Sequence, residues 1–306
     1  MTGGAGFIGS NLIEKIIIEA DKVIVIDNLI TGDAKNIDKF QKEENFKYIE
    51  HDIQESIYLD EKIDYVVHLA SCASPKAYAK YPINTLKSGS IGTINALGIS
   101  KQHNAKFFLA STSEIYGDPE VSPQNENYWG NVNTLGPRSM YDESKRFAES
   151  AVHAYVQTHG LTGNIARIFN TYGPNMQIND GRVVTNFIYQ ALHGNDITIY
   201  GTGEQTRSFS YIEDTVNGIL KIMTNSTSDV FNVGNDNEIS IKYLAEKIIE
   251  LTNSNSNIIY KDLPKDDPKQ RKPDLTKIKN QFNYEPKFSL EEGLKITINW
   301  VEKNYK

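Results

Sequence analysis

Short apolar runs alternate with longer amphipathic stretches along the first half of this 306-residue chain. The apolar runs are rich in Val, Ile and Phe and cover residues 22–26, 65–69, 106–110 and 164–168. The amphipathic stretches space their apolar residues as helices do and cover residues 10–18, 85–103 and 139–159. Such runs predict strands buried on both faces, and their alternation with helices predicts a doubly wound parallel sheet of the α/β class.

The second half of the chain has a different character. Glycines, prolines and charges break it into loops at residues 173–174, 201–203 and 263–274. Helical spacing returns over residues 240–251, with Ser240 as the N-cap, and over residues 290–304. We therefore expect one domain over residues 1–170. Residues 171–306 are expected to form mainly a smaller C-terminal domain, with segments that return to the sheet.

Composition and charge exclude several classes of function. The net charge of −7 and the isoelectric point near 5.5 disfavour a general nucleic-acid binder. No apolar run approaches the roughly 20 residues of a membrane-spanning helix, so no membrane partner is expected. The single cysteine, Cys72, excludes an internal disulfide framework and favours a cytoplasmic location. The six histidines show no ligand spacing, so no metal site is expected.

A glycine-rich loop, Gly3-Gly4-Ala5-Gly6-Phe7-Ile8-Gly9, opens the first predicted helix. Glycines let the backbone approach a pyrophosphate closely, and the free N–H groups of a helix N-terminus favour negative charge. Asp27 ends the next predicted strand, where a carboxylate meets the adenosine ribose of a dinucleotide. An acid there favours NAD over NADP, whose 2′-phosphate meets a like charge, and Asp52 is expected beside the adenine. Together these residues predict a Rossmann-type NAD site.

Tyr141 and Lys145 form a second pattern, because residues four apart lie on one face of a helix. A tyrosine has an ordinary pKa of about 10 and needs a shift of roughly three units to act as a base near pH 7. A lysine cation about 4 Å away supplies a shift of similar size. Thr112 follows a predicted strand, at the edge where the ligand crevice of a parallel sheet opens. These three residues predict a proton-transfer centre.

The segments TGGAGFIGS, ASTSEIYGDP, YDESKRFAE and RIFNTYGPNM resemble the extended short-chain dehydrogenase/reductase family, specifically its nucleotide-sugar enzymes. The likeness covers nearly the whole chain. Longer segments are most similar to the branch that decarboxylates UDP-glucuronate to UDP-xylose, namely HLASCASPKAYAKYPINTLK, DPEVSPQNENYWGNVN, NDGRVVTNFI, YGTGEQTRSFSYIEDTVNG and DDPKQRKPD. The resemblance implies a catalytic NAD, which is regenerated in each turnover, and UDP-glucuronate as the substrate.

The resemblance also implies a role for each matching residue. The implied catalytic residues are Thr112, Ser113, Glu114, Tyr141, Lys145 and Arg207. The implied cofactor-binding residues are Gly3, Gly6, Phe7, Ile8, Gly9, Asp27, Asn28, Thr31, Gly32, Asp52, Ile53, Leu69, Ser71, Ser88, Ala110, Tyr141, Lys145 and Arg182. The implied substrate-binding residues are Lys87, Asn170, Arg207 and Arg271.

The reaction implied by this resemblance begins at the sugar C4 hydroxyl. Tyr141 takes its proton, Thr112 hydrogen-bonds the same oxygen, and hydride passes to NAD. The new ketone makes the C5 carboxylate part of a β-keto acid, which loses CO2. The electrons move to the C4 oxygen, where the two side chains stabilise the oxyanion. A proton then returns to C5 and hydride returns to C4.

Ser113 and Glu114 bear on which sibling reaction to expect. A 4,6-dehydratase of this family carries an aspartic and a glutamic acid after the threonine, and serine is too weak an acid to expel the C6 hydroxyl. A 4-epimerase places small neutral residues there, unlike Glu114. The pair therefore favours the decarboxylase over the dehydratase and the epimerase. A non-catalytic NAD-binding scaffold is the alternative from another class, and the role of Glu114 stays open.

Cations are needed for the carboxylate and the phosphates of such a substrate. The resemblance implies Arg207 at the sugar carboxylate, with Lys87 nearby, and Arg271 at the diphosphate. Arg182 is implied at the nicotinamide or a phosphate, and Asn170 as a donor to the substrate. The planar guanidinium group of arginine suits carboxylate and phosphate oxygens.

The N-terminus departs from the family pattern. Relatives have an apolar strand before the glycine loop, where this sequence has only Met1 and Thr2. That strand is central and paired on both sides, so its loss leaves buried backbone groups without partners. We therefore expect the natural chain to begin upstream.

Relatives of this family also dimerise through two helices of each subunit. The counterparts here are the predicted helix over residues 85–103 and the helix that carries Tyr141. The resemblance therefore implies a homodimer.

Overall fold

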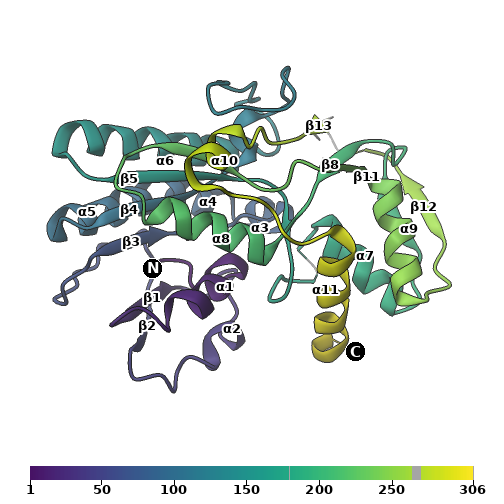
Figure 1. Ribbon diagram of the computed structural model, residues 1–306, viewed down its shortest axis with the longest axis horizontal. Coiled ribbons are helices and arrows are strands. Elements are labelled where there is room, and N and C mark those ends of the chain that lie inside the picture. The colour runs from purple at the N-terminus through teal and green to yellow at the C-terminus, as the bar shows by residue number, and fades with distance from the viewer. Residues whose placement is uncertain (179, 264–269, 306) are drawn as a thin grey trace.

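The computed structural model describes residues 1–178, 180–263 and 270–305, and its largest feature is a parallel β-sheet (Figure 1). The strands of this sheet are β1 (Val23–Asp27), β2 (Phe46–Glu50), β3 (Tyr65–His68), β4 (Lys106–Thr112), β5 (Gly163–Ile168) and β10 (Val230–Val233). They form a ladder in the order β10-β5-β4-β3 and a separate pair β1-β2, all parallel. The predicted α/β class and parallel sheet are confirmed.

Thr2 joins the two parts of the sheet. It forms parallel bridges to Ile26 on β1 and to His68 on β3. The Thr2 N–H donates to the Val67 carbonyl at 2.9 Å, and the Thr2 carbonyl accepts from the Leu69 N–H at 3.1 Å. The neighbours of Thr2 also pair with β1, because the Met1 carbonyl accepts from the Ile26 N–H and the Gly3 N–H donates to the Ile26 carbonyl, both at 2.8 Å. Residues 1–3 therefore occupy the central position where the family pattern predicts a strand.

Helices cover both faces of the sheet (Figure 1). One face carries α5 (Thr93–His103) and α6 (Ser139–His159), with α4 (Pro82–Lys87) packed against α6. The other face carries α1 (Phe7–Ile16) and α8 (Ile212–Met223). Shorter elements of this half are α2 (Lys35–Asp38), α3 (Pro75–Lys80) and the 3-10 turn η2 (Ser113–Tyr116). No helix of the described residues is long and apolar enough to cross a membrane.

The helix predicted over residues 85–103 is interrupted. Between α4 and α5 lies a π-helical turn, η1 (Ser88–Gly92). Gly89 in this turn packs so closely against α6 that a Cβ atom there would lie 2.5 Å from the Cβ of Ser144. The predicted helical segment is confirmed, and the regular periodicity gave no sign of the π-helical turn within it. The predicted bounds of α6 are confirmed.

The second half of the chain adds small sheets and three further long helices. Its elements are β6 (Thr171–Tyr172), α7 (Val183–Leu192), β7 (Ile197–Tyr200), β8 (Thr206–Ser208), β9 (Ser210–Tyr211), β11 (Glu238–Ser240), α9 (Ile241–Thr252), β12 (Ile258–Lys261), β13 (Gln270–Arg271), α10 (Thr276–Phe282) and α11 (Leu290–Tyr305). Ser240 caps α9 as predicted, by accepting from the Tyr243 N–H at 3.1 Å. Residues 264–269 of the predicted charged loop lie outside the described residues.

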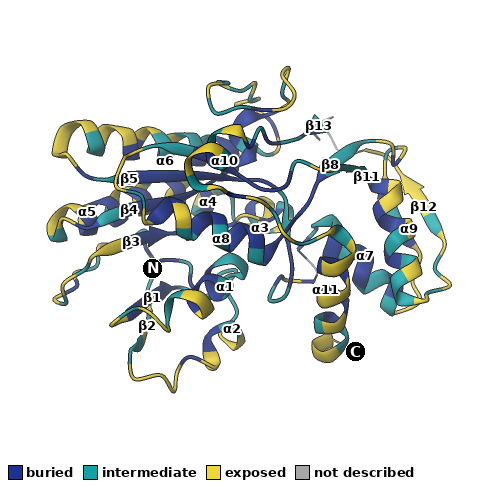
Figure 2. Ribbon diagram, viewed as in Figure 1, coloured by how far each residue is buried: buried dark blue, intermediate teal, exposed yellow. Residues whose placement is uncertain are grey.

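One apolar cluster runs through both halves of the chain. It includes Phe108 on β4 and Ala166 on β5 as well as Ile197, Leu244 and Leu294 from β7, α9 and α11. Figure 2 shows this buried interior along β4 and β5, with exposed residues on the outer faces of the helices. Because the cluster is continuous, α7, α9 and α11 are held firmly beside the carboxyl edge of the sheet (Figure 1).

Candidate active site

One cleft of about 440 Å³ collects nearly all of the predicted site residues. Its wall contains every residue predicted to bind the cofactor and all six predicted as catalytic, together with Asn170 and Arg271. Lys87 is the exception, because its side chain is exposed and only its neighbour Ser88 reaches the wall. Lys87 ends α4 and presents its side chain to solvent, so its substrate contact stays a prediction.

The glycine loop forms one end of the cleft. A Cβ atom on Gly9 would lie 2.4 Å from the Gly3 carbonyl oxygen, so this close crossing of the backbone requires glycine. Gly6 is the N-cap of α1 and has no side chain to bond the free N–H groups of the first turn. These groups are open to a phosphate, and the loop and helix therefore fit the pyrophosphate of a dinucleotide.

Acidic side chains lie at the ends of β1 and β2. Asp27 accepts hydrogen bonds from the N–H groups of Ala5 (3.0 Å) and Leu29 (2.9 Å), which fixes its carboxylate beside the glycine loop. Burial raises the pKa of Asp27 above its ordinary value. The Asn28 amide donates to the Asp52 carboxylate at 3.0 Å, so both predicted adenosine-side acids belong to one rigid edge of the cleft.

Tyr141 and Lys145 come from the first turns of α6, and both are buried. The Lys145 ammonium donates to the Ala110 carbonyl on β4 at 2.7 Å. Burial raises the pKa of Tyr141, and hydrogen bonding with Thr112 opposes that rise. The ring of Tyr141 stacks on Tyr78 of α3, with centroids 5.5 Å apart. The predicted centre of Tyr141, Lys145 and Thr112 is thus assembled in the cleft.

Glu114 is held between two arginines. Arg271 Nη1 lies 2.6 Å from one carboxylate oxygen of Glu114, and Arg138 Nη1 lies 3.2 Å from the other. Burial alone raises the pKa of Glu114, but the two cations outweigh it and hold that pKa below its ordinary value. Arg271 also donates to the Ser113 hydroxyl at 3.2 Å. Glu114 is therefore an anion at neutral pH that orients two guanidinium groups.

Strand pairing puts two of the predicted cations side by side. Arg207 on β8 and Arg271 on β13 are register partners in a parallel pair, and both reach the cleft. Arg182, at the start of α7, pairs with Asp180 at 3.1 Å. Asn170 follows β5 in the wall. Arg138 was not predicted, and its position just before α6, with no local motif, gave no signal from which to find it.

A metal site is not part of this arrangement. Among the described residues no group of three or more His, Cys, Asp or Glu side chains lies in position to hold a metal ion. The chemistry of the cleft is that of a tyrosine, a lysine, hydroxyl groups and arginines around a dinucleotide-shaped groove.

Comparison with known proteins identifies the family. The sequence profile of the GDP-mannose 4,6 dehydratase family matches residues 1–297. The chain is 49% identical to UDP-glucuronic acid decarboxylase 1 of Xenopus tropicalis, over 99% of this chain and 72% of the relative. The chain belongs to the extended short-chain dehydrogenase/reductase family. UDP-glucuronic acid decarboxylase 1 of Arabidopsis thaliana is 48% identical, over 96% of this chain and 67% of that protein.

Solved structures of this family share the fold. UDP-glucose 4-epimerase of Thermotoga maritima, solved with UDP-glucose, matches with a TM-score of 0.92 and 31% identity, over 100% of this chain and 98% of that one. The dTDP-glucose 4,6-dehydratase of Bacillus anthracis, solved with NAD, matches with a TM-score of 0.87 and 27% identity, over 99% and 96% of the two chains. The Rossmann-type architecture predicted from the sequence is confirmed.

Proposed function

We propose that this protein is an NAD-dependent decarboxylase that converts UDP-glucuronate to UDP-xylose. The observation that carries the proposal is the pair Ser113 and Glu114 beside Tyr141, with Glu114 bound to Arg271 and Arg138. A dehydratase needs an acid at the first of these positions, and serine does not supply one. Relatives 45–49% identical over nearly the whole chain are named UDP-glucuronic acid decarboxylases, which supports the same reaction.

The residues of the cleft fit NAD as the cofactor. The glycine loop and the first turn of α1 suit its pyrophosphate, and Asp27 and Asp52 suit its adenosine half. Bound NAD supplies a hydride acceptor that oxidises C4 of the sugar and later returns the hydride. Lys145 stands one helical turn from Tyr141 and favours the phenolate form by its charge.

The chain's own side chains then handle protons and charge. Tyr141 takes the proton from the C4 hydroxyl, and the Thr112 hydroxyl hydrogen-bonds the same oxygen. After C4 becomes a ketone, loss of CO2 leaves negative charge on that oxygen, which both groups stabilise. Arg271 and Arg207 face the same cleft, where Arg207 holds the sugar carboxylate before it leaves and Arg271 meets the diphosphate. Because Glu114 stays ionised, its role is to orient Arg271 rather than to remove a proton.

A direct assay tests this function. Purified protein loaded with NAD is incubated with UDP-glucuronate, and the products are identified by mass. Release of CO2 with formation of UDP-xylose is the expected result, and Tyr141→Phe is expected to abolish turnover while NAD remains bound. Loss of water indicates a dehydratase, and an unchanged mass with inverted C4 indicates an epimerase. NAD binding without any turnover of nucleotide sugars indicates a scaffold, and each of these three results overturns the proposal.

We also propose that the protein forms a homodimer through α4, η1, α5 and α6. These elements pack against one another, and together they expose five large apolar side chains, Ile83, Leu86, Ile91, Ile94 and Phe147. Water-exposed apolar side chains gathered on adjoining helices are typical of an interface. Ile94→Glu is expected to give monomers in sedimentation analysis. Ile259→Glu is the matched control, because Ile259 on β12 is equally exposed (37% against 36%) but lies outside these helices.

A cytoplasmic location is proposed as well, on the basis of Cys72. This single cysteine is buried and free. Reducing compartments keep thiols in that state. Fractionation of cells that carry the gene tests the location, and recovery of the protein in a membrane fraction contradicts it.

A further inference from the structure

Glu149 lies two helical turns beyond Tyr141 on α6 and one turn beyond Lys145. Residues spaced by four lie above one another on a helix, so the three side chains share one face. The Glu149 side chain is only 14% exposed. A largely buried carboxylate needs hydrogen-bond or charge partners. Glu149 lies on the helix face that carries Tyr141 and Lys145, and it has no part in the catalytic or binding roles described above.

Glu149 contacts the strand that carries the catalytic hydroxyl groups. The Ser111 hydroxyl donates to Glu149 Oε1 at 2.5 Å. Ser111 lies in the cleft wall directly before Thr112, and its other neighbour, Ala110, accepts from Lys145. Lys145 and Glu149, both on α6, therefore hydrogen-bond to the adjacent residues Ala110 and Ser111 of β4.

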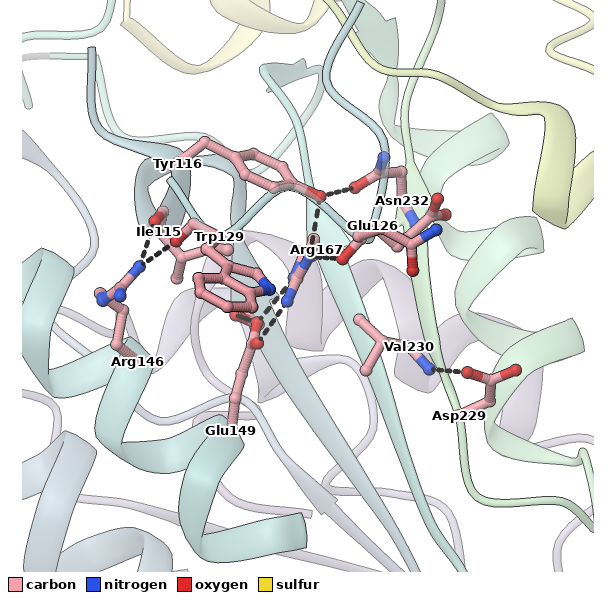
Figure 3. Close-up of polar contacts among 12 residues, drawn as sticks. Ile115, Tyr116, Glu126, Trp129, Arg146, Glu149, Arg167, Asp229, Val230 and Asn232 are labelled. Carbon is pink, nitrogen blue, oxygen red and sulfur yellow. Dashed lines mark hydrogen bonds and ion pairs between the residues drawn. The ribbon is translucent and has the colours of Figure 1, made fainter. Parts of the chain in front are cut away.

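Arg167 on β5 anchors the carboxylate. Its Nε lies 3.1 Å from Glu149 Oε1 and its Nη2 lies 2.8 Å from Oε2, a bidentate pair. Arg167 Nη1 donates further to the Tyr116 hydroxyl at 2.9 Å, and that hydroxyl donates to Asn232 on β10 at 2.8 Å. Figure 3 shows Glu149 and Arg167 pointing towards each other, with Tyr116 and Asn232 beyond them. Glu149 is thus fixed directly by β4 and β5, and its anchor Arg167 is linked through Tyr116 to Asn232 on β10.

Charge relates Glu149 to Lys145 as well. Burial lowers the pKa of Lys145 to about 8, and the charge of Glu149 opposes this fall. Burial also lowers the pKa of His68, on the neighbouring β3, to about 3, so that imidazole is neutral at pH 7. Other charged or titratable groups on the elements packed around Lys145 include Tyr141 and Asp142 on α6, Glu114 and Tyr116 on η2, and Arg167 on β5. Glu149 lies on the same helix face as Lys145, its charge acts on the lysine, and Arg167 holds it in place.

We propose that Glu149 is a positioning residue of the active site. Its anchored carboxylate serves as the counter-charge of Lys145 and, through Ser111, fixes the strand end that presents Thr112. The inference rests on the proposed function, because the charge of Lys145 acts on the reaction through Tyr141. The proposed site on α6 thus includes Glu149, one helical turn after Lys145, and Arg167 holds its carboxylate in place.

The titration of Lys145 tests this inference without any substrate. The protein is labelled with [ζ-15N]lysine, and the resonance that disappears in Lys145→Met identifies Lys145. Glu149→Gln keeps the size of the side chain and an acceptor for Ser111 but removes the charge. The titration midpoint of Lys145 in this variant is expected to fall by about one pH unit, because a neighbouring opposite charge is lost. In a plot of the rate of CO2 release against pH, the fall in rate at alkaline pH is expected to begin at a lower pH in Glu149→Gln. The change is expected in kcat, with KM unchanged.

Two further variants keep the test decisive. Glu149→Gln leaves the buried Arg167 unpaired, and the double variant Glu149→Gln with Arg167→Gln removes that cation as well. Because loss of a nearby cation raises the pKa of a lysine, the midpoint of the double variant is expected to lie between those of Glu149→Gln and the unmodified protein. Arg167→Lys keeps a cation beside Glu149 but loses the bidentate geometry. It is expected to lower Tm and leave the Lys145 midpoint in place. An unchanged midpoint in Glu149→Gln overturns the inference. Absence of CO2 release by the unmodified protein overturns the proposed function instead, while the titration still decides the role of Glu149.

Discussion

His68 makes the stability of this protein depend on pH in a way that can be calculated from its contacts. The side chain is 1% exposed, at the junction between Thr2 and β3. Its Nδ1 lies 2.7 Å from the Thr2 hydroxyl and its Nε2 lies 3.2 Å from the Thr93 hydroxyl. Thr93 donates its own proton to the Gly89 carbonyl, so Nε2 must be the donor to Thr93 and Nδ1 the acceptor from Thr2. The neutral imidazole is therefore the form that the fold accommodates.

The size of the effect follows from the pKa. Burial, aided by the charge of Lys145, lowers the pKa of His68 from 6.5 to about 3. The unfolded chain binds the proton near pH 6.5 and the folded protein does not, so stability falls as the pH drops through this window. At 1.36 kcal/mol per pKa unit, lowering the pH from about 7.5 to about 5 costs about 2 kcal/mol, and the full cost below pH 3 is about 5 kcal/mol.

Urea unfolding at the two pH values measures this cost. His68→Gln keeps one donor and one acceptor but does not titrate, so it is expected to lose about 2 kcal/mol less than the unmodified protein between pH 7.5 and pH 5. His153→Gln is the matched control, because His153 is exposed on α6, and it is expected to follow the unmodified protein. Equal losses in the unmodified protein and His68→Gln refute the reasoning.

Three further predictions follow from the packing. Gly9→Ala places a Cβ atom 2.4 Å from a backbone oxygen and is expected to weaken NAD binding at least tenfold, measured by calorimetry. Gly98→Ala is its control, because a Cβ atom added at Gly98, inside α5, would have no neighbouring atom within 4 Å. This variant is expected to keep its NAD affinity and to gain about 0.5–1 kcal/mol in unfolding free energy. Glu114→Gln leaves the buried Arg271 without its carboxylate and is expected to cost roughly 3 kcal/mol in urea unfolding. Ser240→Ala removes the cap of α9 and should cost about 1 kcal/mol in the same assay. An NAD affinity unchanged by Gly9→Ala, or unfolding free energies unchanged by the other three, contradicts the corresponding contact.

Local sequence patterns were sufficient to predict those parts of the fold and the site that depend only on residues close together in the chain. The glycine loop, the spacing of Tyr141 and Lys145, and the capped start of α9 each depend on residues close together in the chain. A helix imposes the four-residue spacing on any sequence that adopts it, so the shared face of Tyr141 and Lys145 needed no tertiary information.

Contacts between distant segments could not be predicted in this way. Arg271 meets Ser113 across 158 residues, and its bond to Glu114 could not be read from either segment alone. Arg138 precedes α6 without a recognisable motif. The π-helical turn after Lys87 depends on the close contact of Gly89 with α6, which is a property of packing and not of periodicity.

Thr2 connects the two parts of the sheet by bridging Ile26 on β1 and His68 on β3. The pair of β1 and β2 carries Asp27, whereas the ladder of β3, β4, β5 and β10 carries Thr112 and packs against α6. A dinucleotide bound along the cleft would contact both parts at once. Its binding would add RT ln(1 + [NAD]/Kd) to the free energy of unfolding, so saturation with NAD is expected to slow proteolysis of both parts together.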